Sequence, residues 1–483
     1  MSMQRSYTSP TGLAGLAMVV LLTGCAVGPD YKRPDVPLPA TYPDAAGARA
    51  TAEQGKLAAD WWTLYKDATL NDLVADAMQN NTDLHRAVAQ IDEAQAVLDE
   101  ASSTLFPEID LGASSSRSRS STLNAQPLPS NVPAISNSNR LALSASFELD
   151  FWGKLRSASA AARAHVLSSH YARDVIALTV AGTTTQSYFT LRARDAQIAV
   201  TKETLASRVE TLAVIKSRAA AGLASQLEVN QAEVARATAA VQLRELQRQR
   251  ALVEHQLGQL TGKLDLKIAP GDVMTMPMPT LPPVGLPSTL LERRPDVQQA
   301  EQTLIAANAA IGVSRASQFP TFSLTGDFGG QSAKLSNILK SGARIWSIGL
   351  NGLMPIFDAG KYAARTRQAE AVQRQAVAGY EKTVQTAFKD VADALTNVEQ
   401  TSASAGDLQK MVDATHNALH LSRLRYDAGY VGYLEVLDAQ RSANIAELAL
   451  VENRQSQLVY SVDLMKALGG GWSPNQAAPM AQR

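Results

Sequence analysis

Residues 153–269 contain no proline, and this long stretch sets a strong limit on the possible folds. Proline kinks or ends a helix, so its absence over this length permits unusually long helices. We expect one helix from about Gly153 to Ala221 and a second from about Ser225 to Leu260. At 1.5 Å per residue the first would be about 100 Å long, which no compact domain needs. Apolar residues spaced alternately by four and three predict coiled-coil-like packing against neighbouring helices.

The chain contains this helical hairpin twice. Gly222 matches Gly429, and the Leu-Glu-Val at 227–229 matches the Leu-Glu-Val at 434–436, in both cases 207 positions later. Matches that keep their order at a nearly constant offset indicate an internal duplication. A second hairpin is therefore expected over about 361–468, and the two glycines would lie in the tip turns of the two hairpins.

Ahead of each hairpin the sequence changes to a strict alternation of apolar with small or polar residues. The alternation around Phe147 predicts a strand with one apolar and one polar face. Strand pairs are expected at about 107–151, around a Ser-, Pro- and Asn-rich loop at 117–138, and at about 320–357, where the last strand would span 344–357. Each strand has about 10 residues, which is the length that crosses a bilayer when tilted.

Two shorter helices are expected before the first strand pair, at about 68–80 and 82–104. Thr82 is the expected N-cap of the second, because its hydroxyl can accept a bond from a free backbone N–H of the first turn. Phe106-Pro107 ends that helix.

The amino terminus has the form of a bacterial lipoprotein signal. Arg5 precedes a short apolar run, and small residues lead to Cys25, the one cysteine of the chain. The run is too short to span a bilayer as a permanent helix, so we expect a signal peptide at 1–24 and a lipid-modified, palmitate-bearing Cys25. A signal peptide beside an incidental cysteine is the alternative. Ala26, rather than Asp, follows the cysteine, which is typical of lipoproteins sorted to the outer membrane.

These elements predict the organisation of the whole chain. In order, we expect the signal peptide 1–24, a lipidated Pro-rich tether 25–60, a first structural repeat 61–269, a crossover linker 270–287, a second structural repeat 288–469 and a flexible tail 470–483.

Four bilayer-length strands cannot close a barrel by themselves. An open sheet edge in hydrocarbon leaves backbone groups unpaired, at several kcal/mol each. The sequence therefore predicts oligomerisation, and three copies would supply twelve strands. The expected fold class is mainly α with a transmembrane β part: a 12-stranded barrel with four strands per chain, joined to a second, helical tube.

Several motifs in this order resemble the TolC/OprM family of outer-membrane factors, and in particular its lipoprotein branch. They are the Leu-Thr-Gly-Cys ending at Cys25, VGPDYKRP at 27–34, Trp61-Trp62 followed by Asp67, a Phe-Pro before each strand pair, and YLEVLDAQR at 433–441. The resemblance implies a homotrimer in the outer membrane, with a periplasmic α-helical barrel whose tips stay closed. It also implies a periplasmic adaptor protein and an inner-membrane RND-type transporter as partners, export of drugs or other small molecules, and multidrug resistance.

The second tip carries a candidate site. Glu435, Asp438 and Arg441 follow one another at three-residue intervals and so lie near one face of a helix. A solvated, self-paired charged face is the alternative. The resemblance implies that Glu435 and Asp438 ring the aperture as a periplasmic gate and that Arg441 holds a latch.

The resemblance also implies that Tyr426 and Glu228 link neighbouring hairpins; ordinary helix-surface positions are the alternative. Two departures from the family pattern bear on this. Glu228 stands where TolC-like members have Asp, and Val431 stands where TolC has an Arg, which leaves that particular latch unsupported.

The sequence gives little indication of an enzyme or of a protein that binds nucleic acid. Its 45 basic and 45 acidic side chains balance, which gives no hint of a nucleic-acid partner. It has no nucleotide-binding loop, no catalytic cysteine and no expected cofactor. His416 and His420 are four apart on one expected helix, but no acid lies between them as in zinc proteases and no third ligand is apparent, so no metal site is expected.

Two other functions stay open from the sequence. The same channel could serve type I protein secretion, which the residues do not separate from efflux. A periplasmic coiled-coil adaptor lipoprotein without a pore is the alternative from another class. Such a chain would lack paired amphipathic strands.

Overall fold

The computed structural model describes residues 27–39, 41–42, 57–121, 129, 133–282 and 290–473. The expected signal peptide, Cys25, part of the tether, the end of the crossover linker and the tail after residue 473 lie outside the described residues. In chain order the elements are η1 (Trp61–Tyr65), α2 (Ala68–Asn80), α3 (Thr82–Ser103), β1 (Glu108–Arg119), β2 (Ile135–Leu149), α4 (Lys154–Ala220), α5 (Gln226–Thr261), η2 (Val273–Thr275), α6 (Leu290–Arg293), α7 (Pro295–Ala316), β3 (Thr321–Ser332), η4 (Leu335–Asn337), η5 (Ser341–Ala343), β4 (Arg344–Leu353), α8 (Lys361–Asp427) and α9 (Tyr433–Ala467).

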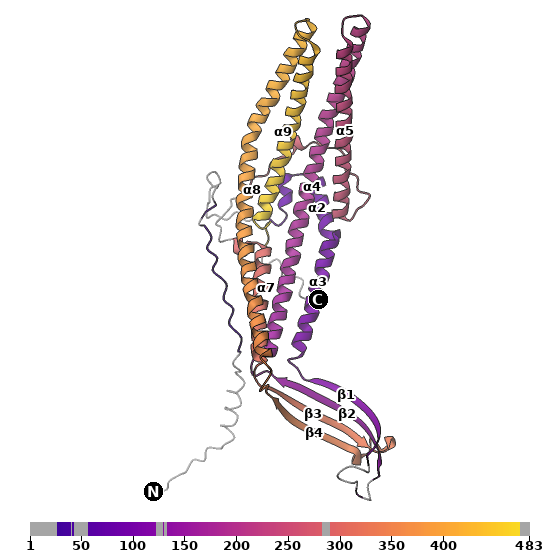
Figure 1. Ribbon diagram of the computed structural model, residues 1–483, viewed down its shortest axis with the longest axis vertical. Coiled ribbons are helices and arrows are strands. Elements are labelled where there is room, and N and C mark those ends of the chain that lie inside the picture. Colours follow the sequence, from indigo (N-terminus) through magenta and orange to yellow (C-terminus); the bar gives the residue numbers. More distant parts are fainter. Residues whose placement is uncertain are drawn as a thin grey trace, which may run out of the picture. The chain divides into compact units, whose positions relative to one another are not determined.

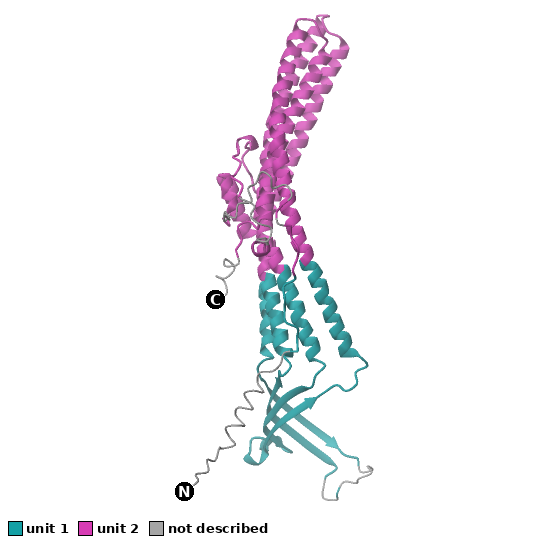
Figure 2. Ribbon diagram, turned by 90° about the vertical axis from the view of Figure 1, so that its left-hand side faces the viewer, with its two compact units in different colours: residues 1–34, 91–169, 300–380 teal, residues 35–90, 170–299, 381–483 magenta. Residues whose placement is uncertain are grey.

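The chain divides into two compact units (Figure 2). Unit 1 comprises residues 1–34, 91–169 and 300–380, and unit 2 comprises residues 35–90, 170–299 and 381–483. Each unit takes segments from both halves of the duplicated sequence. The compact units therefore do not coincide with the sequence repeats.

The sheet of unit 1 is antiparallel, in the order β1-β2-β3-β4. The four expected strands are present, but two expectations about their ends were wrong. Strand pairing continues into the expected loop, with Arg117 opposite Asn137 and Arg119 opposite Ile135. The ladder of backbone bonds does not need apolar side chains, so a Ser- and Asn-rich strand end has no visible alternation. The last strand ends at Leu353 because Pro355 has no N–H to extend it.

The register gives the sheet two different faces. Leu111, Leu143, Phe328 and Trp346 form one row across all four strands. Trp346 and Ile348 on this face are 75% and 76% exposed.

The row of the opposite face consists of small or charged residues. It contains Asp110, Ser144, Asp327 and Ser347. Asp327 accepts bonds from Ser144 and from Arg140 at 2.8 and 2.9 Å. The sheet thus exposes a wide apolar surface on one side and a hydrogen-bonded polar surface on the other.

Residues 27–34 of unit 1 form an extended segment, here called the N-terminal strap, that lies along α7. Asn308 donates to the carbonyl of Pro29 at 2.8 Å. The Tyr31 hydroxyl donates to Glu301 at 3.0 Å, and Arg33 donates to both oxygens of the same carboxylate at 2.7 Å. Glu301 is only 5% exposed, so its charge depends on these partners.

The start of the strap is also held. The Val27 N–H donates to the carbonyl of Trp152 at 3.3 Å. Gly28 passes so close to Gly312 that a Cβ on Gly28 would stand 3.0 Å from the Gly312 Cα. The sequence predicted an extended tether, but not that this part of it is docked.

The two helical hairpins, α4–α5 and α8–α9, have the expected bounds to within one or two residues (Figure 1). They end where the sequence placed a glycine turn. The expected N-cap Thr82 was wrong. Asn81 performs this role, because its side-chain oxygen accepts from the N–H groups of Asp83 and Leu84 at 3.0 and 3.4 Å.

The main core of unit 2 lies where η1 and α2 pack against the hairpins. Trp61 and Tyr65 are almost fully buried there. Tyr65 stacks edge-on against Phe189, with ring centroids 4.8 Å apart, and its hydroxyl is 2.7 Å from that of Ser461. None of the helices in the described ranges is both long and apolar enough to cross a bilayer.

The strap contacts generate a prediction. Glu301→Ala removes the carboxylate that binds Tyr31 and Arg33, and hydrogen bonds to a charged group contribute about 1.5–3 kcal/mol each. We expect trypsin to cleave after the exposed Lys32 several-fold faster, while helix content stays unchanged. Mass spectrometry of a timed digest measures this. Glu93→Ala, at an exposed position of α3, is the matched control, and equal cleavage rates in all three proteins would show that Glu301 does not hold the strap.

Candidate functional site

The two tip turns of unit 2 share one backbone geometry. Gly222 and Gly429 have φ of +75° and +78°, in the left-handed region that glycine enters without strain. The Leu223 N–H donates back to Arg218 at 2.8 Å, and the Tyr430 N–H donates back to Arg425 at 2.9 Å. This bond over five residues is the Schellman ending of a helix. Nothing lies within 4 Å of a Cβ built on either glycine, so the backbone angle alone selects glycine.

The carboxylate of Glu228 is used at the first tip. Ser225 is the N-cap of α5, and its hydroxyl accepts from the Glu228 N–H at 3.2 Å. The Glu228 carboxylate reaches back to the Ser225 N–H at 2.7 Å. Within one chain this residue therefore completes a capping box, whose two reciprocal bonds fix the start of the helix.

The second tip brings the predicted charged residues together. Arg425 of α8 donates to Glu435 of α9 at 2.8 Å, and Arg441 donates to Asp438 at 2.7 Å. All four side chains are between 41% and 72% exposed. Glu435, Asp438 and Arg425 line a groove of about 560 Å³ between α8 and α9. The sequence did not predict the role of Arg425. This residue lies on α8 before the tip turn, and the turn brings Glu435 of α9 back alongside it.

Tyr426 lies between the two hairpins of the same chain. The guanidinium of Arg218 stands 5.0 Å from the centre of its ring, and the ring of Tyr433 meets it edge-on at 5.9 Å. Burial is the main cause that raises the pKa of Tyr426, although Arg218 opposes the shift. Leu212 and Ile215 of the first hairpin complete this small core with Tyr433. The two tips are thus packed together by aromatic and aliphatic contacts.

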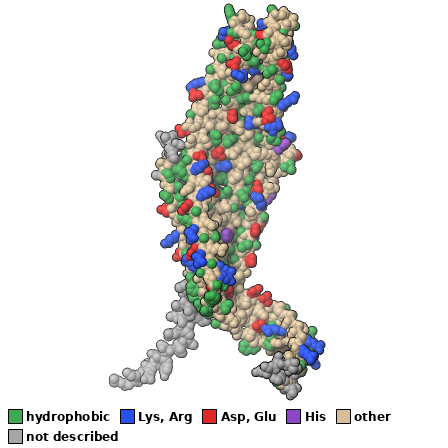
Figure 3. Space-filling model, in the orientation of Figure 1, with side chains coloured by type: hydrophobic (Ala, Val, Ile, Leu, Met, Phe, Trp, Pro, Cys, Tyr) green, Lys and Arg blue, Asp and Glu red, His purple; other side chains and the backbone are tan. Residues whose placement is uncertain are grey.

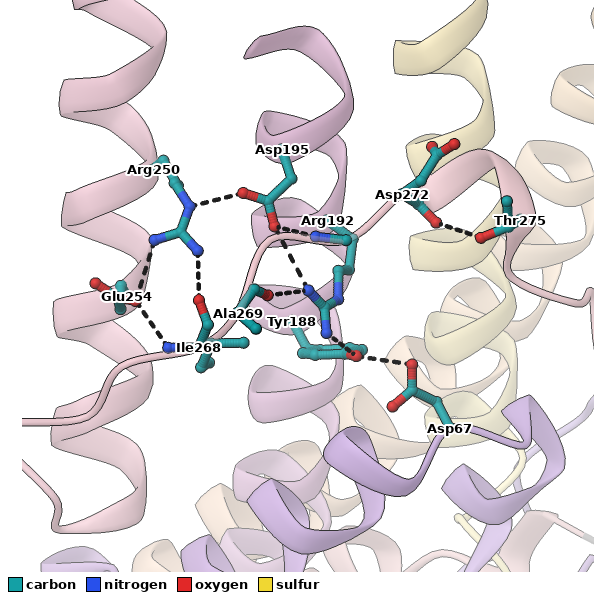
Figure 4. A network of polar contacts seen from close by, with 11 residues as sticks. Asp67, Tyr188, Arg192, Asp195, Arg250, Glu254, Ile268, Ala269, Asp272 and Thr275 are labelled. Atoms are coloured by element: carbon teal, nitrogen blue, oxygen red, sulfur yellow. Dashed lines mark hydrogen bonds and ion pairs between the residues drawn. The ribbon is translucent and has the colours of Figure 1, made fainter. Parts of the chain in front are cut away.

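A second set of polar residues, which we call the buried network, lies deeper in unit 2 (Figure 4). The hydroxyl of Tyr188 donates to Asp67 at 2.7 Å and accepts from Arg192 at 2.8 Å. Arg192 also donates to the carbonyl of Ala269 at 2.6 Å. Asp67 meanwhile caps α2 by accepting from the Leu70 N–H. The side chains of Tyr188 and Arg192 on α4 therefore connect the residue before α2 with the segment that follows α5.

The other half of the buried network joins α4 to α5. Arg250 donates to Asp195 at 2.6 Å and to the carbonyl of Ile268 at 2.7 Å. Glu254 accepts from the Ile268 N–H at 3.0 Å and from Lys267 at 2.9 Å. Burial opposes the charge on Glu254, but these donors and Arg250 outweigh it and lower its pKa.

The sequence predicted only Asp67 of the buried network, as a motif residue. Tyr188, Arg192 and Asp195 follow a helical spacing on α4, and Arg250 and Glu254 follow one on α5. No spacing connects these two helical stretches with Asp67 or with Ala269, which lie far away along the chain.

The histidine pair of α8 lies beside a groove of unit 2. His416 bonds to Glu447 of α9. His420 lines this groove together with His416 and Glu447. Among the residues that the structure describes, no group of three or more His, Cys, Asp or Glu could hold a metal ion. Cys25 lies outside the described residues, so its environment stays a matter of sequence.

The geometry defines a class of protein. A sheet with one wide apolar face, on a chain whose helical hairpins are far longer than a compact domain needs, is the combination found in outer-membrane channels built from strands and long helices. The chain belongs to the outer membrane efflux protein family, which matches residues 73–263 and 286–470.

Individual relatives support this assignment along nearly the whole chain. Outer membrane protein OprJ of Pseudomonas aeruginosa is 34% identical over 472 residues, which cover 96% of this chain and 97% of OprJ. Toluene efflux pump outer membrane protein TtgF of Pseudomonas putida is 34% identical, covering 97% of this chain and 99% of TtgF. Cation efflux system protein CusC of Escherichia coli O157:H7 is 31% identical, covering 96% of this chain and 99% of CusC.

The solved structure of the Campylobacter jejuni CmeC outer membrane channel resembles this chain with a TM-score of 0.86 at 26% identity, covering 93% of this chain and 96% of CmeC. The chain is therefore an efflux channel protein of the outer membrane. Its family transports substrates and is not a family of enzymes.

The buried network generates a prediction about pH. Burial, followed by the bond to Asp67, raises the pKa of Tyr188 to about 12 from an ordinary value of 10.0. Because tyrosine in the unfolded chain loses its proton first, the contribution of Tyr188 to stability is complete below pH 10 and is lost as the pH rises from about 10 to about 12. The Tyr188→Phe variant should have a lower melting temperature than the wild type at pH 7. Between about pH 10 and about pH 12, its melting temperature should fall by less than that of the wild type.

Circular dichroism of the detergent-solubilised protein measures both effects. Tyr430→Phe is the matched control, because Tyr430 is 81% exposed. If the melting temperature falls equally at alkaline pH in the wild type and in Tyr188→Phe, the ionisation of Tyr188 is not coupled to folding.

Proposed function

We propose that three copies of this chain form one gated duct, which exports small molecules from the periplasm through the outer membrane. Each copy contributes four strands to a closed barrel and two hairpins to a periplasmic helical tube. The tips of the second hairpins, with Glu435, Asp438 and Arg441, restrict the periplasmic end.

The observation that carries the assembly is the open sheet. β1 and β4 are edge strands, and each is paired on one side only. With the apolar face toward lipid, these edges would leave backbone N–H and C=O groups unpaired in hydrocarbon, at several kcal/mol each. Pairing β1 of one copy with β4 of the next satisfies them, and a ring of identical contacts closes without a remaining edge.

The polar face of the sheet supports a water-filled interior. Residues that face the inside of membrane barrels are polar, and residues that face lipid are apolar. Ser144 and Arg140 both donate to Asp327 on this polar face. Paired amphipathic strands also distinguish the chain from a coiled-coil adaptor, which would lack them.

The gate is proposed at the second tip because its carboxylates are exposed and held only by surface ion pairs. In a trimer, Glu435 and Asp438 bring six carboxylates near one axis, which attracts cations. Arg425 and Arg441 partly neutralise them within each chain. Arg441 is proposed as a latch, and Tyr426 and Glu228 are proposed to steady the hairpins against one another.

Energy and selectivity are proposed to come from partners. The sequence has no nucleotide-binding motif, so a passive duct needs an inner-membrane RND-type transporter and a periplasmic adaptor that reaches the tips. The relatives carry names of toluene and cation efflux. We propose drugs or other small molecules as the class of substrate here, and acyl chains on Cys25 as a lipid anchor.

The gate generates a prediction. Replacing both Glu435 and Asp438 by Ala removes the charge ring, so single-channel conductance in planar bilayers should rise at least about two-fold and cation preference should weaken. Asp407→Ala with Asp413→Ala is the matched control, because these exposed carboxylates lie on α8 away from the tip. Unchanged conductance in the tip variant would remove these residues from the constriction.

Lipid anchoring generates a second prediction. Cys25→Ser removes the only thiol of the chain, so labelling with radioactive palmitate should disappear. Ala26→Ser keeps the thiol and should label like the wild type. Label that persists on the Cys25→Ser protein would refute the assignment.

A further inference from the structure

Charge is distributed unevenly along the sheet of unit 1. Between Asp110 and Glu148 the sequence contains three arginines and no acid. Between Asp327 and Asp358 it contains two lysines and one arginine, and again no acid. The whole chain, in contrast, has equal numbers of acidic and basic residues. The cations are thus gathered on the halves of the strands that lead into the β1–β2 and β3–β4 turns.

Five of these cations are exposed and have no acidic partner among the residues that the structure describes. We call them the basic collar: Arg117, Arg119, Lys334, Lys340 and Arg344. The sixth, Arg140, is neutralised by Asp327 on the polar face. Figure 3 shows Lys and Arg side chains gathered at this end of the sheet. The carboxylates of Glu108, Asp110 and Glu148 lie toward the opposite end of the strands.

The collar continues the apolar face and does not lie on the polar one. Side chains alternate along a strand, so Arg117 and Arg119 share a face with Leu111, and Arg344 shares a face with Trp346. Arg344 is two residues beyond Trp346, or about 7 Å along the strand. Leu335 and Leu339, beside the two lysines, are 68% and 86% exposed. On β4 the surface therefore passes from apolar residues, through the ring of Trp346, to the cation of Arg344, and the two lysines lie among exposed leucines.

That sequence of side chains matches the boundary between hydrocarbon and lipid headgroups. Tryptophan favours this boundary, and arginine beyond it meets phosphate, which it can bind through two parallel N–H bonds. Five like charges on two neighbouring hairpins repel one another unless an anion lies between them.

We propose that the basic collar binds the phosphate groups of the glycolipid in the outer leaflet of the outer membrane. The proposal rests on the proposed function, because it needs the β-turns outside and the helices in the periplasm. The opposite end of the strands carries the carboxylates of Glu108, Asp110 and Glu148, which would repel the same anionic headgroup. The collar fixes the depth of the strands in the membrane and gives them one orientation.

The test is a titration of the detergent-purified, full-length protein with diphosphorylated lipid A, read by native mass spectrometry. The same glycolipid with its phosphates removed forms the second arm, and inorganic phosphate as a competitor forms the third. We expect the diphosphorylated form to bind at least about 10-fold more tightly than the dephosphorylated form. Equal affinity for the two forms, or complete displacement by about 10 mM inorganic phosphate, would overturn the proposal.

Variants locate the site. Glutamine at all five collar positions should abolish the preference for the phosphorylated glycolipid. The control variant carries Lys202→Gln, Arg244→Gln and Lys382→Gln at exposed helix positions, and it should keep this preference. Exchanging Arg and Lys at the collar preserves charge and should retain binding to within about three-fold. This exchange guards against a collar that is merely needed for folding. A glutamine variant that keeps the full preference would contradict the proposal.

Conductance separates this proposal from the proposed function. If the chain does not form a duct, the wild type gives no current in planar bilayers whatever its affinity for glycolipid. If only the collar proposal fails, current is present and the preference for phosphate is absent.

Discussion

Backbone groups at the two edges of the sheet need hydrogen-bond partners. β1 and β4 each leave one row of N–H and C=O groups without a partner in the four-stranded order. Water satisfies such groups and hydrocarbon does not, which is why we propose that another copy of the chain closes this sheet.

Within unit 2, a different interaction keeps the hairpins in place. Arg192 is buried and Arg250 is partly buried, and both are paired with the carboxylate of Asp195. Each also donates to a backbone carbonyl of the segment that follows α5, Arg192 to Ala269 and Arg250 to Ile268. Removing one member of a buried ion pair costs about 3–5 kcal/mol, because the other charge is left without compensation. The buried network therefore gives the bases of the hairpins one arrangement, whereas apolar contacts alone would allow helices to slide.

Sequence predicted the features that depend on local chemistry and missed those that depend on meeting in space. Gly222, Gly429 and the absence of proline fixed the hairpins to within a residue or two, since only glycine enters the left-handed turn without strain. Thr82 was the wrong cap because Asn81, one position earlier, has a side chain that reaches two N–H groups. Glu301, the partner of the strap residue Arg33, and Ala269, which accepts from Arg192, lie too far away along the chain for any periodicity to reveal them. Arg425 pairs with Glu435 only because the tip turn folds back.

The ion pairs of unit 2 contribute more stability in the buried network than at the second tip, and this difference suits a gate at the tip. The pairs Arg425–Glu435 and Arg441–Asp438 are exposed, and such pairs contribute only about 0–1 kcal/mol each. They can exchange partners at little cost, whereas the network at the base cannot. In the proposed gate, opening would then be confined to the tips, where Tyr426 and Tyr433 of the second hairpin pack against Arg218, Leu212 and Ile215 of the first. A partner that binds the tips would then need to supply only the free energy of a few surface ion pairs.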